Sequence, residues 1–525
     1  MRVLVSDRIA EDGIEILREG AEVDVRTGLS PEELVAAIPD YHGLVVRSDT
    51  RVTADVLAAG RNLMVVGRAG VGVDNIDVPA ATQRGIVVVY APEGNTVSAA
   101  EHTVALMLAL ARHVPAAHAS LSQGKWERSK FVGVELRGKT LGLFGLGRVG
   151  AEVARRARGF EMNILGFDPF VTPERAQTLG VHLATKEELI AQSDFISLHV
   201  PLTADNRNLL GEAEFKLTKP EARIINVARG GLVDEAALIR ALDAGRVAGA
   251  AFDVFDPEPP AMDSPILFHP KVIVTPHLGA STAEAQERVA VDVAHQVLAV
   301  LRNEPATYAV NLPTLGAEAF KIIGPYLAAA TKAASLATQL SSGQFESVEI
   351  EYLGELADME TGPLKAAVIK GLLATISEEN VTLVNAALVA EQRGLRITER
   401  KAPYDGIYKD LIRVHLTTSG GTTTVSATLA HDGPHIVEVK DFWVDVTAGE
   451  GYLLICENLD RPGMVGAVGT FLGEKDINIS FMRVGREKVR GQALMIMGLD
   501  DDLDSETLTQ IARIPDITSA RIARL

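Results

Sequence analysis

The fold of this chain is decided by the stretch Gly145-Leu146-Gly147-Arg148-Val149-Gly150. This stretch follows an apolar run at 141–144 and precedes a segment whose apolar residues recur at helical spacing. A second apolar run at 163–167 then ends at Asp168. A strand, a glycine-rich turn, a helix and a second strand that ends in an acid together are typical of a dinucleotide-binding unit.

Each of the three glycines has a physical task in such a unit. Gly145 allows the tight turn, Gly147 lets the backbone approach a diphosphate, and Gly150 lets the helix pack against the strand. The diphosphate is expected on the free N–H groups of the helix N-terminus, where the helix dipole favours negative charge. Asp168 would accept hydrogen bonds from the ribose and repel a 2′-phosphate, so we predict NAD rather than NADP as the cofactor.

The composition restricts the class of protein. At 525 residues the chain is too long for one core, and 47% hydrophobic residues are ample for several packed cores. The net charge of −18 argues against a nucleic-acid or anionic-membrane partner. One cysteine, Cys456, and an N-terminus that enters a strand directly predict a cytoplasmic protein. The histidines show no metal-ligand spacing, so no metal site is predicted.

The order of the predicted elements divides the chain into domains. Strands alternate with helices up to residue 312, which predicts an α/β fold with two doubly wound parallel sheets. Since the dinucleotide pattern begins only near residue 140, we predict a Rossmann domain at 98–284 inserted in a flavodoxin-like substrate-binding domain at 1–97 plus 285–312. An α+β domain is predicted at 313–447. The pattern β-α-β-β-α-β predicts a ferredoxin-like domain at 452–525.

Three polar residues could carry chemistry beside such a cofactor. Arg229 and His277 each follow an apolar strand, and ligands bind at the carboxyl ends of strands in open parallel sheets. A histidine can take a hydroxyl proton as a hydride leaves. The third residue, Glu258, could fix the tautomer of the histidine, and the arginine could hold a carboxylate by two parallel hydrogen bonds.

With these residues, the chain resembles the D-isomer-specific 2-hydroxyacid dehydrogenase family. The resemblance rests on the glycine-rich motif, Asp168, Asn226-Val227-Ala228-Arg229-Gly230-Gly231, Asp256-Pro257-Glu258-Pro259 and Pro276-His277-Leu278-Gly279-Ala280-Ser281-Thr282. Further similar segments lie at 45–48, 65–75 and 94–101. The whole chain is similar to the long members of the family, which act on 3-phosphoglycerate.

The resemblance implies a role for each matched residue. It implies that His277 is the acid/base, Glu258 its partner and Arg229 the anchor of the substrate carboxylate. The residues implied to contact NAD are Gly145, Gly147, Arg148, Val149, Gly150, Asp168, Val227, Asp253 and His277. The residues implied to contact the substrate are Arg47, Arg68, Gly70, Asn95 and Arg229. Arg47 and Arg68 would hold a phosphate, because the planar guanidinium matches phosphate oxygens.

The C-terminal domain resembles an ACT domain, a module that often binds amino acids. The resemblance implies that Asn458, Asp460 and Asn478 bind L-serine at an interface between two chains. We therefore expect a homodimer or a homotetramer. An acidic side chain can accept from the ammonium group, while amides can donate to the carboxylate.

The expected function is NAD-dependent oxidation of 3-phospho-D-glycerate to 3-phosphooxypyruvate, the first step of L-serine biosynthesis. The expected partners are this substrate and L-serine as an effector, with no nucleic acid and no membrane. Two other readings stay open. One is a dehydrogenase for another small 2-hydroxy acid such as 2-hydroxyglutarate, and the other is an NAD-sensing regulatory protein.

Overall fold

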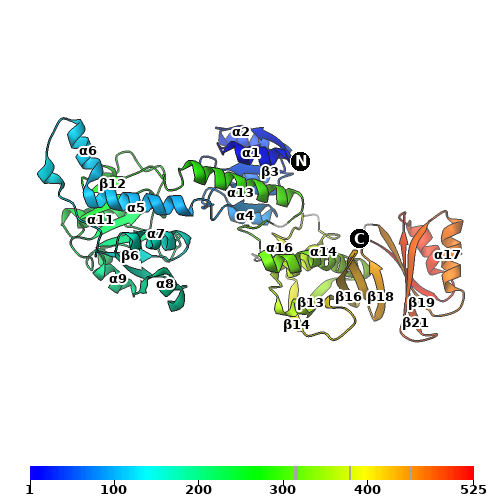
Figure 1. The fold of residues 1–525 in the computed structure, drawn as a ribbon. Coiled ribbons are helices and arrows are strands. Elements are labelled where there is room, and N and C mark those ends of the chain that lie inside the picture. The colour runs from blue at the N-terminus through cyan, green and yellow to red at the C-terminus, as the bar shows by residue number, and fades with distance from the viewer. Residues whose placement is uncertain (305, 313–316, 378–379, 450) are drawn as a thin grey trace.

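The computed structural model describes residues 1–304, 306–312, 317–377, 380–449 and 451–525. Four units form an elongated molecule (Figure 1). We name them the first unit (1–97 and 285–312), the nucleotide unit (98–284), the third unit (317–449) and the fourth unit (451–525). The nucleotide unit and the fourth unit lie at opposite ends, and the other two lie between them (Figure 1).

The first unit contains a parallel sheet in the order β2-β1-β3-β4-β5, which is the doubly wound order of flavodoxin-like folds. Its elements are β1 (Arg2–Val5), α1 (Glu11–Arg18), β2 (Glu22–Val25), α2 (Pro31–Ala37), η1 (Ile38–Asp40), β3 (Gly43–Val46), α3 (Ala54–Ala59), β4 (Val65–Arg68), α4 (Val78–Gln83) and β5 (Val87–Tyr90). Helix α13 (Ala283–Leu301) brings the chain back from the nucleotide unit. Its buried Val289, Val293 and Val297 recur every four residues and pack on β4 and β5, so the return closes the core of the first unit.

The nucleotide unit contains a seven-stranded parallel sheet in the order β12-β11-β10-β9-β6-β7-β8. Its elements are α5 (Thr96–Arg112), α6 (Val114–Ser122), η2 (Arg128–Phe131), β6 (Thr140–Phe144), α7 (Arg148–Gly159), β7 (Asn163–Phe167), α8 (Pro173–Leu179), β8 (His182–Leu183), α9 (Lys186–Gln192), β9 (Phe195–Leu198), α10 (Glu212–Phe215), β10 (Arg223–Asn226), α11 (Glu235–Asp243), β11 (Gly249–Phe252), α12 (Pro265–Phe268) and β12 (Val272–Val274). The strand order reverses between β6 and β9, and ligands bind at such a switch point.

Helix α5 joins the first unit to the nucleotide unit and packs against α7, β10 and β11. Among the described residues, no single helix has the length and hydropathy to cross a membrane. Helices α5 and α6 reach that length only together, and they are bent by 61° at their junction.

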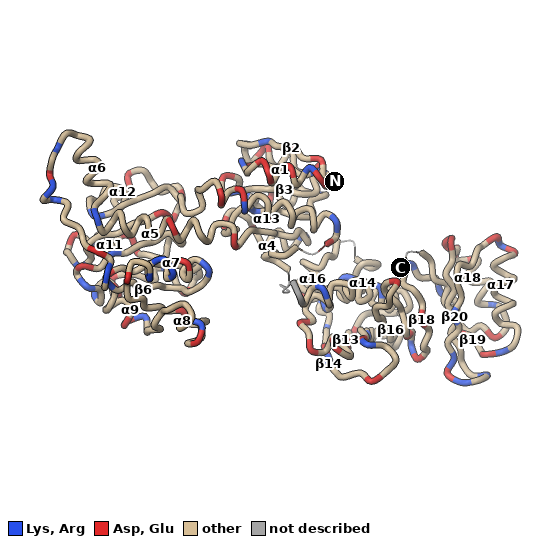
Figure 2. The backbone as a smooth tube through the Cα atoms, in the orientation of Figure 1, with Lys and Arg blue, Asp and Glu red and all other residues tan. Residues whose placement is uncertain are grey.

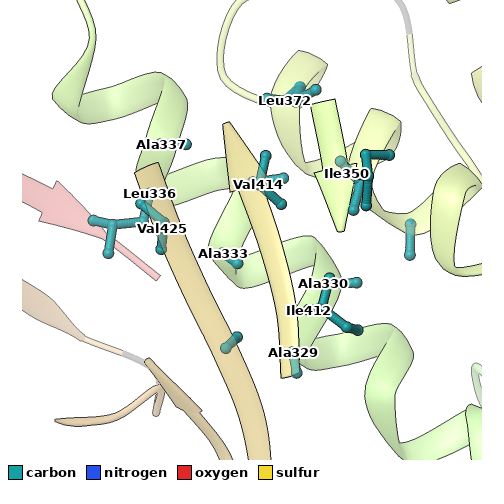
Figure 3. Close-up of a cluster of buried hydrophobic side chains, with 14 of the residues drawn as sticks. Ala329, Ala330, Ala333, Leu336, Ala337, Ile350, Leu372, Ile412, Val414 and Val425 are labelled. Carbon is teal, nitrogen blue, oxygen red and sulfur yellow. The ribbon is translucent and has the colours of Figure 1, made fainter. Parts of the chain in front are cut away.

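The third unit is a six-stranded mixed sheet in the order β14-β13-β15-β16-β17-β18, with β13 and β14 parallel and the other pairs antiparallel. Its elements are α14 (Ala317–Leu340), β13 (Phe345–Gly354), η3 (Glu355–Asp358), α15 (Gly362–Leu373), α16 (Ala386–Gln392), β14 (Arg396–Ala402), β15 (Asp410–Thr418), β16 (Gly421–Ala430), β17 (Gly433–Val439) and β18 (Phe442–Thr447). Figure 3 shows small residues of α14, including Ala330 and Ala333, beside Ile412 and Val414 of β15. Alanine side chains let the helix lie close to the sheet.

The fourth unit has an antiparallel sheet in the order β20-β21-β19-β22. Its elements are β19 (Tyr452–Leu459), α17 (Met464–Glu474), β20 (Ile479–Arg486), β21 (Gln492–Leu499), α18 (Ser505–Ala512) and β22 (Ile517–Arg524), which confirms the predicted β-α-β-β-α-β order. One face of the sheet is covered by α17 and α18. The other face, with Leu453, Ile455 and Ile496, belongs to the same hydrophobic core as the third unit. The third and fourth units therefore share one core.

Candidate active site

The glycine-rich turn lies between β6 and α7 at the switch point of the nucleotide unit. Gly145 has φ +89°, a conformation that L side chains rarely adopt. A Cβ on Gly150 would lie 2.1 Å from the carbonyl oxygen of Gly145, so only glycine lets the helix approach the turn. A Cβ on Gly147 would meet nothing within 4 Å. The backbone at Gly147 therefore borders open space at the N-terminus of α7, where a diphosphate fits.

Asp168 follows β7 and supports this turn. Its Oδ2 accepts from the amide of Leu146 at 2.8 Å, and its Oδ1 accepts from the amide of Phe170 at 2.9 Å. The side chain is partly exposed, and each carboxylate oxygen keeps a second lone pair. Asp168 can therefore hold the glycine-rich turn and still accept from ribose hydroxyls.

His277 and Glu258 form a hydrogen-bonded pair. His277 Nδ1 lies 2.7 Å from Glu258 Oε2, and Glu258 Oε1 accepts from the amide of Phe255 at 2.9 Å. Burial alone would raise the pKa of Glu258, but the hydrogen bonds from His277 and the Phe255 amide hold that pKa below its ordinary value. The carboxylate is thus charged at neutral pH and fixes the imidazole, which leaves Nε2 available for a substrate.

A largely apolar cavity of about 380 Å³ adjoins this pair. It is lined by Phe255, Glu258, Pro259, Pro260, Met262, Leu267, Val274, Thr275, Pro276 and His277. The catalytic candidates therefore border a hollow with few polar groups besides their own.

Asp253 lies beneath the loop that carries His277. It is fully buried, and it accepts from the amides of Leu278 at 2.7 Å and Gly279 at 2.8 Å. It also accepts from Thr275 Oγ1 at 2.5 Å, and His102 Nε2 lies 3.2 Å from it. Burial would raise the pKa of Asp253, but these hydrogen bonds outweigh burial and lower it. In this structure Asp253 holds the loop; a contact with the nicotinamide stays a prediction.

Val227 and Arg229 lie on the turn after β10. Asn226 closes this turn, because its Nδ2 donates to the Arg229 carbonyl at 2.9 Å and its Oδ1 accepts from the Ala228 amide at 3.1 Å. Val227 Cγ1 would lie 3.2 Å from a Cβ placed on Gly279, so Val227 borders the His277 loop. The turn thus brings Arg229 and the His277 loop to the same edge of the sheet.

Three arginines, Arg47, Arg68 and Arg229, gather where the first unit meets the nucleotide unit; we call this junction the cleft. Basic and acidic residues are interspersed over all four units (Figure 2), so this is a local grouping. Burial, and then the charges of Arg229 and Arg47, lower the pKa of Arg68 to about 10. The Nε of Arg68 is buried and has no hydrogen-bond partner among the described residues. Several guanidinium groups close together, with an N–H donor that has no partner, are typical of a binding site for an anion.

The other predicted substrate residues lie around these arginines. A Cβ on Gly70 would lie 1.5 Å from an Arg68 guanidinium nitrogen, so the backbone of Gly70 adjoins Arg68. The Gly70 amide donates to the Arg68 carbonyl at 2.8 Å, and Arg47 donates to the Arg8 carbonyl at 3.4 Å. Asn95 precedes α5 and makes no side-chain capping bond, which leaves its amide for another partner.

The three predicted serine residues do not meet within one chain. Strand register aligns Asn458 with Ala493 and Arg486, whereas Asn478 precedes Ile479 at the opposite end of the sheet. Asp460 accepts from Arg486 at 3.2 Å and from the Arg490 amide at 3.0 Å. Asn478 donates to Asp500 at 2.7 Å. Buried Asn458 has an Oδ1 without a partner among the described residues. A site built from all three needs a second chain.

Sequence reasoning missed three residues that the structure places around the site: His102, Asp74 and Glu93. His102 contacts Asp253 and Thr275 from α5, a segment distant in sequence. Asp74 pairs with Arg229, and Glu93 pairs with Arg148. Asp74 lies inside the similar segment at 65–75, and Glu93 directly precedes the one at 94–101. This position in the sequence could have pointed to both residues. No group of three or more His, Cys, Asp or Glu residues within the described ranges could hold a metal ion.

Comparison with known proteins agrees with this geometry. Residues 104–279 match the NAD-binding domain of the D-isomer specific 2-hydroxyacid dehydrogenases. The chain is similar to a Thermus thermophilus protein of known structure, with TM-score 0.55, 37% identity, and coverage of 59% of this chain and 100% of that one. It is also similar to D-lactate dehydrogenase from Escherichia coli, with TM-score 0.54, 26% identity, and coverage of 59% and 100%. Fold and site thus define a D-isomer-specific 2-hydroxyacid dehydrogenase, and the prediction of NAD is confirmed.

The matches of the third and fourth units show which member of the dehydrogenase family this chain resembles. Residues 322–440 match the D-3-phosphoglycerate dehydrogenase intervening domain, and residues 452–516 match the ACT domain. D-3-phosphoglycerate dehydrogenase from Synechocystis is 44% identical over 100% of this chain and 95% of its own length. The Bacillus subtilis enzyme of that name is 42% identical over 100% of this chain and 99% of its own length. The chain belongs to the D-3-phosphoglycerate dehydrogenase family.

Proposed function

We propose that this chain oxidises 3-phospho-D-glycerate to 3-phosphooxypyruvate with NAD, as the first step of L-serine biosynthesis. The observation that carries the proposal is the cluster of Arg47, Arg68 and Arg229 at the same cleft as the dehydrogenase motifs. A substrate with a carboxylate at one end and a phosphate at the other relieves the repulsion among three guanidinium groups.

The residues of the cleft divide the chemistry among them. Arg229 holds the carboxylate next to the reacting carbon, and Arg47 and Arg68 hold the phosphate. His277 takes the proton of the 2-hydroxyl through Nε2, while Glu258 keeps the imidazole oriented through Nδ1. Bound NAD supplies the hydride acceptor. An apolar lining adjoins His277 and Glu258 on one side, while both side chains remain open to solvent in this structure.

The phosphate assignment is tested by Arg47→Ala and Arg68→Ala. Each substitution should lower kcat/KM for 3-phosphoglycerate by roughly tenfold to a hundredfold, because a hydrogen bond to a charged group contributes about 1.5–3 kcal/mol. The value for D-lactate should change much less, since it carries no second anionic group. Equal losses on 3-phosphoglycerate and D-lactate would mean that these arginines support the fold or the carboxylate, and the phosphate assignment would fail.

The candidate substrates differ in whether they carry a second anionic group. 2-Hydroxyglutarate also has two negative ends, so it could use Arg229 and the other arginines, whereas D-lactate has only one. A regulatory NAD sensor could carry the same pair of His277 and Glu258, so this pair does not decide between the two classes. The similarity over the full chain to relatives named D-3-phosphoglycerate dehydrogenase favours an enzyme.

Regulation by an amino acid belongs to the same proposal. We infer that L-serine binds between the ACT domains of two chains in a homodimer or homotetramer, with Asn458 and Asp460 of one chain facing Asn478 of the other. The separation of these residues within one chain supports a shared site. Asp460 could accept from the serine ammonium group, in exchange for its present bonds to Arg486 and Arg490.

Calorimetric titration of L-serine into the wild type and Asp460→Ala, with activity measured in parallel, tests this site. We expect binding and inhibition in the wild type and a marked loss of both in the variant. If millimolar serine neither binds nor inhibits the wild type, the regulatory proposal is wrong. If serine acts equally on Asp460→Ala, the site lies elsewhere.

A further inference from the structure

An ion pair crosses the cleft at the residue that should hold the substrate carboxylate. Arg229 Nε lies 3.5 Å from Asp74 Oδ2. Arg229 belongs to the nucleotide unit, and Asp74 belongs to the loop that follows β4 in the first unit. A Cβ on Gly72 would lie 2.6 Å from the Arg229 guanidinium and 2.7 Å from Asp74 Oδ2, so the absence of a side chain at 72 lets the two groups approach.

The two partners are held very differently. The Arg229 side chain is 32% exposed and also donates to the Ala228 carbonyl at 2.7 Å, so the guanidinium is fixed by its own turn. The Asp74 side chain is 81% exposed. Asp74 can therefore move into water while Arg229 stays in place.

The other acid near the cluster has a different task. Asp7 accepts from the amides of Arg47 and Thr50 at 2.6 and 3.1 Å and from the Thr50 hydroxyl at 2.5 Å. Asp7 is 4% exposed, and its hydrogen bonds hold it against the loop after β3. Both acids oppose the fall in the pKa of Arg68, but of these two only Asp74 is exposed enough to leave.

We propose that Asp74 is an internal carboxylate that occupies Arg229 until the substrate carboxylate replaces it, and that it thereby sets the affinity of the cleft for 2-hydroxy acids. This inference rests on the proposed function, because it takes Arg229 as the carboxylate anchor. Exchange of one carboxylate for another keeps Arg229 neutralised in both states. An exposed ion pair is weak, so the exchange is easily reversed.

The proposal predicts the sign of a substitution. Removal of the Asp74 charge leaves Arg229 without a competing anion, so Asp74→Asn should bind substrate more tightly. The gain should be about two- to fivefold at low ionic strength, which is the range that an exposed ion pair supports. It should shrink as salt screens the pair.

A second cross-cleft pair offers a matched control. Arg148 lies 3.2 Å from Glu93, which also accepts from the hydroxyl of Tyr308 at 2.9 Å. Glu93→Gln removes a cross-cleft ion pair without touching Arg229. Asp55→Asn removes one exposed charge from the first unit at the start of α3 and leaves both ion pairs in place.

The experiment is titration of 3-phosphoglycerate into the full-length enzyme saturated with NADH, followed by NADH fluorescence at two ionic strengths. The proteins are the wild type, Asp74→Asn, Asp74→Glu, Glu93→Gln and Asp55→Asn. We expect a lower Kd for Asp74→Asn alone, and a smaller gain at high salt. Asp74→Glu should stay near the wild type, because it keeps the charge.

Three results would overturn the proposal. One is an unchanged or higher Kd in Asp74→Asn. Another is an equal gain in Asp55→Asn, which would assign the effect to net charge. The third is an equal gain in Glu93→Gln, which would assign it to looser contact between the two units. If the wild type neither binds nor oxidises 3-phosphoglycerate, the proposed function fails instead. The Asp74 inference is then judged by the same titration with the 2-hydroxy acid that the enzyme does oxidise.

Discussion

At the scale of single residues, we propose that His277 takes the proton and that Glu258 orients its imidazole. We expect His277→Ala to lower kcat on the order of 10²- to 10⁴-fold, because the proton acceptor is lost. The dissociation constant for NADH should change little, since the glycine-rich turn and Asp168 are untouched. Steady-state kinetics and NADH fluorescence give the two values. Unchanged turnover would remove His277 from the mechanism.

His199 gives the nucleotide unit a pH-dependent stability. His199 is half-buried, and this burial lowers the pKa of its imidazole to about 4. Its Nε2 lies 2.9 Å from Ser197 Oγ. The ordinary histidine pKa is about 6.5, so between about pH 4 and 6.5 the unfolded chain binds a proton that the folded chain does not. His199 therefore destabilises the fold progressively as pH falls through this window and has no such effect above it.

The corresponding prediction compares the wild type with His199→Gln, which cannot titrate. From pH 6.5 to 5.5 the wild type should lose up to about 1.4 kcal/mol more free energy of unfolding than the variant. Between pH 7 and 8 the two proteins should show the same pH dependence. Chemical denaturation monitored on the nucleotide unit provides the comparison, and parallel curves at all pH values would contradict it.

Sequence patterns could place Arg229, Glu258 and His277 because each follows or adjoins a predicted strand end. The pairing of Glu258 with His277 was predicted, and the structure has it. The partners Asp74 and His102 could not be predicted in the same way. Their contacts join segments more than a hundred residues apart, and periodicity carries no information on such distances.

At the scale of elements, two glycines of the glycine-rich turn have different tasks: Gly150 allows the fold, and Gly147 borders the expected cofactor position. Gly147→Ala places its methyl group in open space, so stability should be nearly unchanged. The methyl group would occupy the approach of the diphosphate, so NAD affinity should fall roughly tenfold or more, equivalent to about one charge-assisted hydrogen bond.

Gly150→Ala, in contrast, should destabilise the fold, because its Cβ would collide with the carbonyl oxygen of Gly145. Such overpacking costs about 1–3 kcal/mol or more. Thermal unfolding and NAD titration of both variants give the comparison. A destabilised Gly147→Ala with normal NAD affinity would show that the open space at Gly147 is not the cofactor side.

The elements themselves were largely predictable. The stretch 411–430 is rich in Thr, Ser and Gly, which predicts an antiparallel hairpin, and the structure forms it as the pair β15 and β16. The sequence also predicts a helix at 317–339, which is α14. Helix α6 was missed, because it buries no residue and therefore lacks an amphipathic pattern. The strands β14, β17 and β18 were also missed. Their pairing depends on tertiary contacts that a local pattern does not contain.

At the scale of the whole molecule, the third unit contacts the first unit at the turn between α4 and β5. Thr382 of the third unit donates to the carbonyl of Gly85 at 3.1 Å, and Asn385 donates to the carbonyl of Gln83 at 3.3 Å. Gly85 has φ +71°, and it connects α4 to β5 in the first unit. Because the third and fourth units share a core, movement of the ACT domain would reach this turn.

We expect Thr382→Val to weaken inhibition by L-serine several-fold without changing the serine dissociation constant, because it removes this hydroxyl contact at nearly constant volume. Thr398→Val is the matched control, since Thr398 bonds only within the third unit to the Val348 carbonyl. Calorimetry and inhibition curves are compared across the three proteins. Equal inhibition in Thr382→Val and the wild type would rule out this turn as the route.

The most direct test of the proposed function is NADH formation by the wild type with 3-phosphoglycerate, D-2-hydroxyglutarate and D-lactate under identical conditions. We predict a kcat/KM for 3-phosphoglycerate that exceeds the other two by about a hundredfold, the contribution of one to two hydrogen bonds between arginine and phosphate. A preference for either non-phosphorylated acid, or no NADH from any of the three, would contradict the proposed function.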